Sequence, residues 1–388
     1  MQINSDDAIE IFNRYLEKLI EKEGTDLHIK SNSVIRARIK GSIIPLGIES
    51  VSSDDVDRIV EYLLDKDMDK FKRDYAYDTI YILDEKHRFR VNLYYQLKGI
   101  AIVLRLIPHQ IKSFEQLNLP SALSRISQLQ RGLVLVTGTT GCGKSTTLAS
   151  IVEDINRQSH RHVITIEDPI EYVYDDDKCV IEQRSIGQHA ADFGTALRSA
   201  LREDPDIIIV GELRDLETAR NVLQAVNTGH LVFTTLHTLD AKETIDRLLA
   251  IFPKEEQERV RMDLAENLEV VISQRMLRDV KDNLIPAVEL MFKSSRTQQL
   301  IASSREAELL DAMTTDHNSF GSIPMDNSLF YLTLEGKISE ETAYINATHP
   351  TNLRLMFTTS VEYQKKIGAG SLDDAVMIKG DEEDNKKN

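Results

Sequence analysis

Residues 138–145 combine three glycines, a lysine and a hydroxyl residue at a spacing suited to phosphate binding. The segment GTTGCGKS matches the pattern G-x-x-x-x-G-K-[ST] at every fixed position. The glycines let successive backbone N–H groups point at phosphate oxygens. Lys144 supplies a charge for the β and γ phosphates of ATP, and Ser145 offers its hydroxyl to Mg²⁺. A glycine-rich turn that merely joins a strand to a helix is the competing interpretation. The residues predicted to bind the nucleotide are Gly138, Thr139, Thr140, Gly141, Cys142, Gly143, Lys144, Ser145 and Thr146.

Carboxylates follow two further apolar runs. The segment HVITIEDPIEY carries Glu167 and Glu171, and the segment DPDIIIVGELRD carries Glu212. Because ligands bind at the carboxyl ends of parallel strands, we expect these acids to lie on the same edge as the phosphate loop. Hydrolysis needs a metal held across two phosphates and a positioned water, so one acid serves the metal and another the water. For any single acid, a solvated loop or a helix cap is the alternative.

Two histidines flank a third apolar run in the segment TGHLVFTTLHT. His230 and His237 lie seven residues apart without a third metal ligand at suitable spacing, so the pair does not predict a metal site. We interpret them as sensors that report the γ-phosphate to the next strand. His237 is the stronger candidate, because His230 can equally be a core histidine with its hydrogen bonds satisfied.

The elements that position these residues divide into two domains. Residues 5–23 have helical apolar spacing with Gly24 as the expected C-cap, and residues 52–74 indicate a second helix. Five alternating runs between 26 and 107 predict an antiparallel sheet. After Pro108, strands alternate with helices as in a parallel α/β sheet. We expect a small α+β domain at 1–107, a hinge at 108–119, an α/β domain with C-terminal helices at 120–370 and a disordered acidic tail at 371–388.

Composition excludes several classes of protein. The sequence has no apolar run of the roughly 18 residues that a membrane span needs, and its start resembles no signal peptide, so we expect a cytoplasmic protein. Two cysteines rule out a disulfide framework and a CxxC zinc site, and Cys142 reads as a small residue that fits the loop. The net charge of −16 argues against a nucleic-acid partner gripped over a large surface.

The order of the motifs resembles the secretion-type ATPases, and within them the PilT-like type IV pilus retraction motors. The resemblance covers roughly residues 5 to 290 and includes TDLHIK, RFRVN and TIDRLLAIFP. It implies a PAS-like amino-terminal domain and a RecA-like P-loop ATPase domain. It also implies a homohexamer at the cytoplasmic face of the inner membrane, at the base of a pilus machine. Expected partners are the inner-membrane platform protein and a paralogous retraction ATPase.

The resemblance also implies roles for individual residues. Glu171 falls on the position of the family's catalytic base, within an acidic box that begins at Glu167. Glu212 is the carboxylate of an atypical Walker B strand, with Gly211 where many P-loop enzymes have aspartate, and joins Ser145 at the metal. His230 and His237 match the family's histidine box. Arg90 and Arg105 match first-domain positions that reach the nucleotide phosphates, where a permanently charged fork can neutralise γ-phosphate charge.

Three functions remain open. The leading hypothesis is a motor that hydrolyses ATP to drive pilus disassembly and twitching motility. A nucleic-acid motor on the same core and a regulatory ring subunit with little turnover are the alternatives. The family's AIRNLIR signature reads RTQQLIA here, at 296–302, and only Leu300 and Ile301 agree. We expect that helix to survive with both residues inward, and we interpret the change as a mark of a divergent or accessory retraction ATPase.

Overall fold

The computed structural model describes residues 5–108, 110–363 and 365. The chain divides into two compact units, one formed by residues 1–111 with 170–175, and the other by 112–169 with 176–388. The tail predicted to be disordered, 371–388, lies outside the described residues. Among the helices in the described part of the chain, none combines the length and apolar character needed to cross a membrane.

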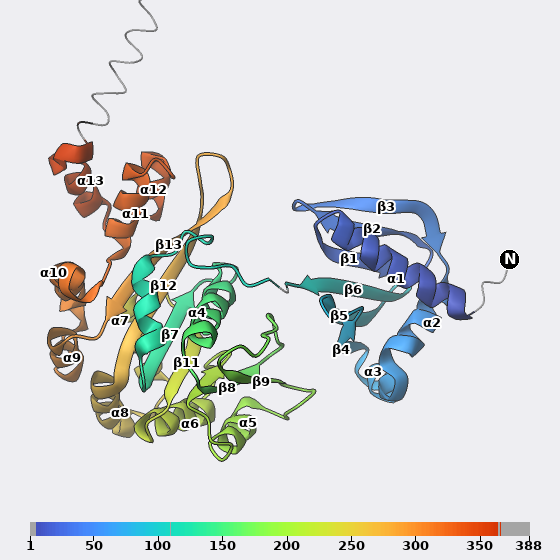
Figure 1. Ribbon diagram of the computed structural model, residues 1–388, viewed down its shortest axis with the longest axis horizontal. Helices are drawn as coiled ribbons and strands as arrows, with labels where there is room; N and C mark the ends of the chain where they lie inside the picture. The colour runs from blue at the N-terminus through green and yellow to red at the C-terminus, as the bar shows by residue number, and fades with distance from the viewer. Residues whose placement is uncertain (1–4, 109, 364, 366–388) are drawn as a thin grey trace, which may run out of the picture. The chain divides into compact units, whose positions relative to one another are not determined.

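The first unit is an antiparallel sheet with helices on one face (Figure 1). Its strand order is β3-β2-β1-β6-β5-β4, and the paired strands run antiparallel. The helices are α1 (Ser5–Glu21), α2 (Ser53–Leu64) and α3 (Met68–Asp74), with a short 3-10 turn at Asp65–Asp67. The strands are β1 (Gly24–Lys30), β2 (Ser33–Ile39), β3 (Ser42–Val51), β4 (Ala76–Ile82), β5 (Arg88–Gln96) and β6 (Gly99–Ile107).

Alternation along the strands separates the two faces of this sheet. Phe89, Val91 and Leu93 of β5 are fully buried among side chains from α1 and α2, whereas Arg90 and Asn92 between them point to the other face. The period of two therefore places a helix-covered core on one side and charged residues on the other.

The start of β1 corrects one expectation. The left-handed residue after α1 is Glu23, with φ +52°, and not Gly24. Gly24 instead begins β1, and a Cβ atom there would lie 2.4 Å from the Leu19 side chain. At this position the absence of a side chain lets Leu19 and the Arg38 carbonyl pack closely, and glycine does not serve as the helix cap.

The second unit is built on a seven-stranded sheet in the order β13-β12-β7-β11-β10-β8-β9. Its pairs are parallel except β12 with β13. The strands are β7 (Gly132–Gly138), β8 (His162–Glu167), β9 (Val180–Ser185), β10 (Ile207–Val210), β11 (Leu231–Leu236), β12 (Leu268–Arg278) and β13 (Leu284–Phe292). The helices along these strands are a 3-10 segment at Ser121–Gln128, α4 (Lys144–Gln158), α5 (Phe193–Ala200), α6 (Leu216–Asn227), α7 (Ala241–Ala250) and α8 (Lys254–Asn267).

The central strands of this sheet are buried along their whole length. Every residue of β7, β10 and β11 is buried, as expected when helices cover both faces of a parallel sheet. Because the faces are closed, polar side chains on these strands can reach a ligand mainly at the strand ends.

Further helices follow β13 (Figure 1). They are α9 (Ser295–Ala302), a 3-10 turn at Glu306–Glu308, α10 (Leu309–Phe320), α11 (Met325–Leu334), α12 (Glu340–Asn346) and α13 (Pro350–Thr359). Of these, α10 and α11 contact β13, α12 contacts β12, and α9 packs against α8. The α9 helix is the one expected at 296–302. Leu300 and Ile301 are 5% and 2% exposed, which confirms that both point inward.

Candidate functional site

The phosphate loop joins the end of β7 to the start of α4. Gly138, Gly141 and Gly143 have φ angles of +139°, +81° and +92°, a region that favours glycine. A Cβ atom on Gly138 would lie 2.5 Å from the Cys142 sulfur and from the Gln274 carbonyl oxygen. The loop can therefore curl tightly against β12 and present the first N–H groups of α4 to an anion.

Lys144 lies across this loop. Its Nζ donates to the carbonyl oxygens of Gly138 at 2.8 Å and Thr139 at 3.2 Å, and lies 3.4 Å from His237 Nδ1. A lysine ammonium can only donate, so this contact is a hydrogen bond in the tautomer whose Nδ1 accepts and whose Nε2, the nitrogen nearer Glu212, carries the proton.

The order of the strands brings three predicted residues together. Strand β11 lies between β7 and β10, so His237 after β11 stands between Lys144 and Glu212. His237 Nε2 is 3.2 Å from Glu212 Oε1, and Arg214 Nη2 is 2.7 Å from Glu212 Oε2. A continuous polar chain thus runs along the carboxyl ends of three strands.

Arg214 is the member of this chain that the motifs did not identify. Burial raises the pKa of the Glu212 carboxyl, but the hydrogen bond from Arg214 and the basic groups Arg214, His237 and Lys144 lower it further, so the net shift is downward. The same hydrogen bond raises the pKa of Arg214. Glu212 is therefore a carboxylate at neutral pH. The sequence feature that could have identified Arg214 is its position two residues after Glu212 in GELRD.

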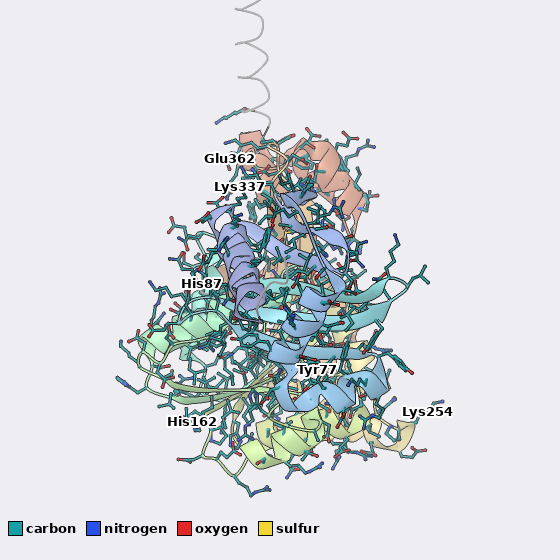
Figure 2. All side chains as sticks on the ribbon, turned by 90° about the vertical axis from the view of Figure 1, so that its right-hand side faces the viewer. Tyr77, His87, His162, Lys254, Lys337 and Glu362 are labelled. Carbon is teal, nitrogen blue, oxygen red and sulfur yellow. The ribbon has the colours of Figure 1, made fainter. Side chains whose placement is uncertain are left out.

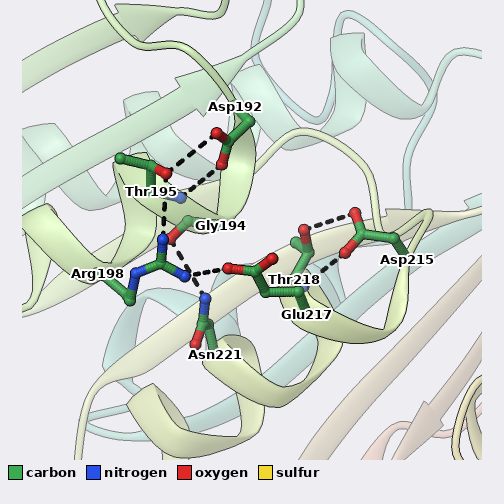
Figure 3. Close-up of polar contacts among 8 residues, drawn as sticks. All are labelled: Asp192, Gly194, Thr195, Arg198, Asp215, Glu217, Thr218 and Asn221. Carbon is green, nitrogen blue, oxygen red and sulfur yellow. Dashed lines mark hydrogen bonds and ion pairs between the residues drawn. The ribbon is translucent and has the colours of Figure 1, made fainter.

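The loop that carries Glu212 and Arg214 ends at Asp215, and Figure 3 shows the polar contacts that fix the start of α6 at that point. Asp215 caps α6 by accepting from the Thr218 backbone N–H at 2.8 Å and from its hydroxyl at 2.8 Å. Arg198 of α5 pairs with Glu217 in the first turn of α6. These contacts tie the start of α6 to α5, and they hold the preceding loop in place.

Gly211 occupies the position where many P-loop enzymes carry aspartate, and local packing explains it. Its N–H donates to the Ile166 carbonyl at 2.8 Å, and its own carbonyl accepts from the Thr235 hydroxyl at 2.7 Å. A Cβ atom would lie 3.3 Å from the Ile166 oxygen and 3.4 Å from Glu167 Cα. The backbone of β8 passes close to this residue, which leaves little room for a side chain.

The two acids of the predicted box fall in different units. Glu167 ends β8 and accepts from the Thr165 hydroxyl at 2.7 Å and the Gln183 amide at 3.3 Å. Glu171 is exposed and lies in the segment 170–175, which groups with the first unit. The structure therefore places Glu167 on the sheet edge as an anchored side chain.

Arg90 and Arg105 lie side by side on the open face of the first sheet, directly opposite each other in the β5–β6 register. Arg105 Nε donates to Asp26 Oδ1 at 2.8 Å, and Arg90 Nε is 3.7 Å from Asp78 Oδ1. The Arg105 side chain is 68% exposed, and the Arg90 side chain is 41% exposed. Two guanidinium groups are thus fixed on one sheet face with much of their surface accessible.

His230 is not brought to the phosphate loop. His230 precedes β11, whereas His237 follows it. Because a six-residue strand spans about 20 Å, the two histidines lie at opposite ends of this strand. His230 Nδ1 is 2.9 Å from the Ala225 carbonyl and 3.1 Å from the Thr228 hydroxyl. The geometry favours the alternative of a histidine with satisfied hydrogen bonds.

The donors at the loop suit a metal held through phosphates. Ser145 is half-buried in the first turn of α4, one residue after Lys144, and Glu212 is a carboxylate whose pKa Lys144 helps to lower. In the ranges 5–108, 110–363 and 365, no three His, Cys, Asp or Glu side chains are arranged to hold a metal ion. A hydroxyl, a carboxylate and phosphate oxygens match the way Mg²⁺ is bound at nucleotides. Burial raises the pKa of Cys142, so its thiol stays protonated.

This combination of a phosphate loop after a buried parallel strand and a carboxylate on the next strand but one defines a P-loop ATPase with a RecA-like core. The chain belongs to the family described as "Type II/IV secretion system protein", whose model matches residues 3–317. The members of this family are ATPases, and so is this chain.

Individual relatives agree with this assignment. The chain is 40% identical over 333 residues to the type IV pilus retraction ATPase PilT of Pseudomonas aeruginosa, covering 85% of this chain and 96% of that protein. It is 32% identical over 356 residues to the type IV pilus ATPase PilU of the same species, covering 90% and 92%. A crystal structure of the pilus retraction motor PilT with bound ADP superposes with a TM-score of 0.82 at 37% identity, covering 89% of this chain and 99% of that one. The resemblance and the two-domain fold inferred from the motifs are thereby confirmed.

Proposed function

We propose that this chain is a retraction-type motor that hydrolyses ATP, with Mg²⁺, to drive pilus disassembly and twitching motility. The observation that carries the proposal is the polar chain from Lys144 through His237 to Glu212 at the carboxyl ends of the strands. It occurs in a chain that matches nearly the full length of a pilus retraction ATPase.

In the proposed reaction, water attacks the γ-phosphorus while the bond to the β–γ bridging oxygen breaks. Lys144 leaves its loop carbonyls to face the β and γ phosphates, and Ser145 and Glu212 are the residues that would hold Mg²⁺. Mg²⁺ supplies charge neutralisation across the two phosphates when it is bound. Glu171 accepts the proton of the attacking water.

The Lys144–His237–Glu212 contacts suggest how the site senses its ligand. His237 accepts from Lys144 and directs its Nε2–H at Glu212. When Lys144 turns to a phosphate, His237 Nδ1 loses its hydrogen-bond donor. The hydrogen bonds of His237 therefore depend on whether a phosphate is bound. His237 is therefore the sensor in this proposal, and a sensing role for His230 finds no support in its position at the far edge of the sheet.

Motion is the second part of the proposal. Arg90 and Arg105 stand on the first unit and carry the charge that stabilises the transition state, so hydrolysis requires the units to approach. Residues 108–119 act as the hinge. Six copies form a ring, and the ring works at the cytoplasmic face of the inner membrane on the platform protein of the pilus machine.

An accessory role is the second candidate, and α9 favours it. Arg296 and Gln299 are exposed on this helix, and Gln298 stands where the family signature has arginine, while the buried Leu300 and Ile301 agree with that signature. The surface of α9 has changed over a preserved core. A paralogous main retraction ATPase is the partner that such a chain would assist.

Deleting the gene and counting surface pili tests the function. A retraction motor leaves excess pili and no twitching, whereas an assembly motor leaves no pili. Full rescue of twitching by this chain in a strain without its main retraction ATPase would exclude the accessory role. Turnover of the purified chain separates both from a regulatory subunit, and DNA-stimulated turnover would support a nucleic-acid motor instead.

A further inference from the structure

Glu289 is a buried carboxylate of the ATPase unit that the proposed reaction does not use. It lies on β13 and is 5% exposed. It stands opposite Ser273 of β12, which stands opposite Thr137 of β7, the residue before Gly138. The Thr137 hydroxyl donates to the Ser273 hydroxyl at 3.0 Å. Glu289 therefore belongs to the cross-strand row one residue before Gly138, the end of the phosphate-loop strand.

The two carboxylate oxygens of Glu289 each serve a different helix. Oε1 accepts from the backbone N–H of Ala241, the first residue of α7, at 2.9 Å. Oε2 accepts from the backbone N–H of Met325, the first residue of α11, at 3.3 Å. The N-cap of α11 is Pro324, which makes no side-chain cap bond. Glu289 thus supplies from the sheet a cap that Pro324 lacks, and a negative charge suits both helix N-termini.

The start of α7 is joined to His237 by a short, internally bonded segment. Thr238 is 1% exposed, and its hydroxyl lies 2.7 Å from that of Thr244, which also donates to the Asp240 carbonyl at 2.6 Å. The Leu239 N–H donates to Glu243 at 2.8 Å. These bonds tie residues 238–240 to the first turn of α7, and so connect that turn to the neighbouring His237.

We propose that Glu289 is a positioning residue of the ATPase site, which holds the first turn of α7 so that His237 faces Lys144 and Glu212, and which links this turn to helix α11. The inference rests on the proposed function of the site. It gives the C-terminal helices a direct polar connection to the residue that senses the phosphate.

A cavity of about 190 Å³ lies beside this carboxylate, between α7, α10 and α11. Leu310 and Met313 of α10 line it without filling the space next to Glu289. The other ionisable groups that line this cavity are Asp240 and Lys242 at the start of α7, Glu306 before α10, Asp326 on α11 and His349 before α13. Arg275 on β12 also acts on the carboxylate. Of these, Asp240 opposes the ionised form and Arg275 supports it.

Protonation changes what Glu289 can accept. Burial raises the pKa of Glu289 to about 7, against the hydrogen bonds from Ala241 and Met325. A carboxylate accepts both N–H groups, whereas a protonated carboxyl turns one oxygen into a donor that opposes one of them. We expect the longer bond, to Met325, to weaken first, so acidification loosens the link between α7 and α11.

Glu289→Gln tests the proposal, because the amide accepts one N–H and cannot accept the second. Between pH 6 and 8, kcat of the wild-type chain should rise several-fold with pH. In the variant it should stay at the low-pH level, about 5-fold below wild type at pH 8. KM for ATP should change less than 2-fold, since the phosphate loop is untouched. Ala241→Pro should also lower kcat, because proline at the first helical position removes the donated N–H while fitting the helix.

Asp326→Asn is the matched control. Asp326 is also 5% exposed and accepts two backbone N–H groups, from Thr348 and His349, but makes no bond to α7. The Asp326→Asn substitution should lower thermal stability, while kcat keeps the wild-type pH profile. A Glu289→Gln enzyme with wild-type kcat and pH profile, or an equal kcat loss in Asp326→Asn, would overturn the proposal.

Amide hydrogen exchange over residues 237–244 gives a readout that does not need turnover. Exchange should be faster in Glu289→Gln and unchanged in Asp326→Asn and Lys144→Ala. Faster exchange in a chain without any ATP hydrolysis would sink the proposed function and leave the positioning role standing. Unchanged exchange in Glu289→Gln would sink the positioning role.

Discussion

The two sheets of this molecule carry their charged side chains in different places. The antiparallel sheet of the first unit is open on one face, and Arg90 and Arg105 stand on that face, aligned by strand register. The parallel sheet of the second unit is closed on both faces, so Lys144, His237 and Glu212 come from loops where strands end. The type of sheet thus decides where charged side chains can meet a ligand. In the first unit they stand in fixed register on a sheet face, and in the second they lie in loops that can rearrange around a ligand.

The largest effect should come from the strand-end cluster. Lys144→Ala removes the cation that faces the phosphates and should lower ATP turnover at least about 100-fold, the loss typical of removing a charge-stabilising donor. Steady-state phosphate release measures it. Lys254→Ala is the control, because Lys254 is exposed on α8 and points away from the ribbon (Figure 2). Turnover near the wild-type level in the Lys144 variant would refute the site.

The second prediction concerns the acid that lies outside the parallel sheet. Glu171→Gln should keep ATP binding and lower hydrolysis about 100-fold, because general-base catalysis contributes at least that much. Glu167→Gln should lose less, since Glu167 is bonded to Thr165 and Gln183 as an anchor. Single-turnover kinetics with a separate binding assay distinguish the two. If only the Glu167 variant fails, the role of base belongs to Glu167.

The third prediction uses the buried carboxylate of the closed sheet. The pKa of Glu289 is raised in the folded chain, from an ordinary 4.5 to about 7. A raised pKa stabilises the fold fully below pH 4.5, and this contribution is lost as the pH rises toward 7. Relative to Glu289→Gln, the wild-type unfolding free energy should therefore fall by about 2 kcal/mol between pH 5 and pH 7. Urea unfolding at both pH values measures it, and a constant difference would contradict the assignment.

The smallest effects should come from the open sheet face. Arg90→Ala and Arg105→Ala should each lower hydrolysis about 10-fold, or about 1.4 kcal/mol. The two should differ in stability. Arg105 pairs with the buried Asp26, so its loss should cost about 1 kcal/mol, whereas the exposed Arg90–Asp78 pair should cost almost nothing. Equal thermal shifts in both variants would show that the Arg105–Asp26 pair stabilises the fold no more than the exposed Arg90–Asp78 pair.

The sequence patterns correctly predicted where Lys144, Glu212 and His237 lie. Each comes after an apolar run, and parallel strands bring the ends of those runs together. Their roles in hydrolysis stay predictions. The same rule, applied fully, would have separated His230 from His237, because one precedes β11 and the other follows it.

Other features depend on contacts that no side-chain pattern records. Glu289 interrupts an apolar strand, and its partners are two backbone N–H groups far away in the chain. Arg214 gains its role only because β10 and β11 are neighbours, which sets Glu212 between it and His237. Gly24 showed the usual sign of a helix cap, but packing against Leu19 explains it. Such contacts emerge only after the chain has folded.

Gly211 has a consequence for how tightly the two strands beside it can pack. Its backbone is bonded to Ile166 of β8 and to Thr235 of β11. A Cβ atom at this position would meet the backbone of β8 at 3.3 to 3.4 Å, so a larger side chain would require β8 to shift by a few tenths of an ångström. The absence of a side chain thus keeps the spacing of these strands small, directly beside the residue, Glu212, that supplies the carboxylate.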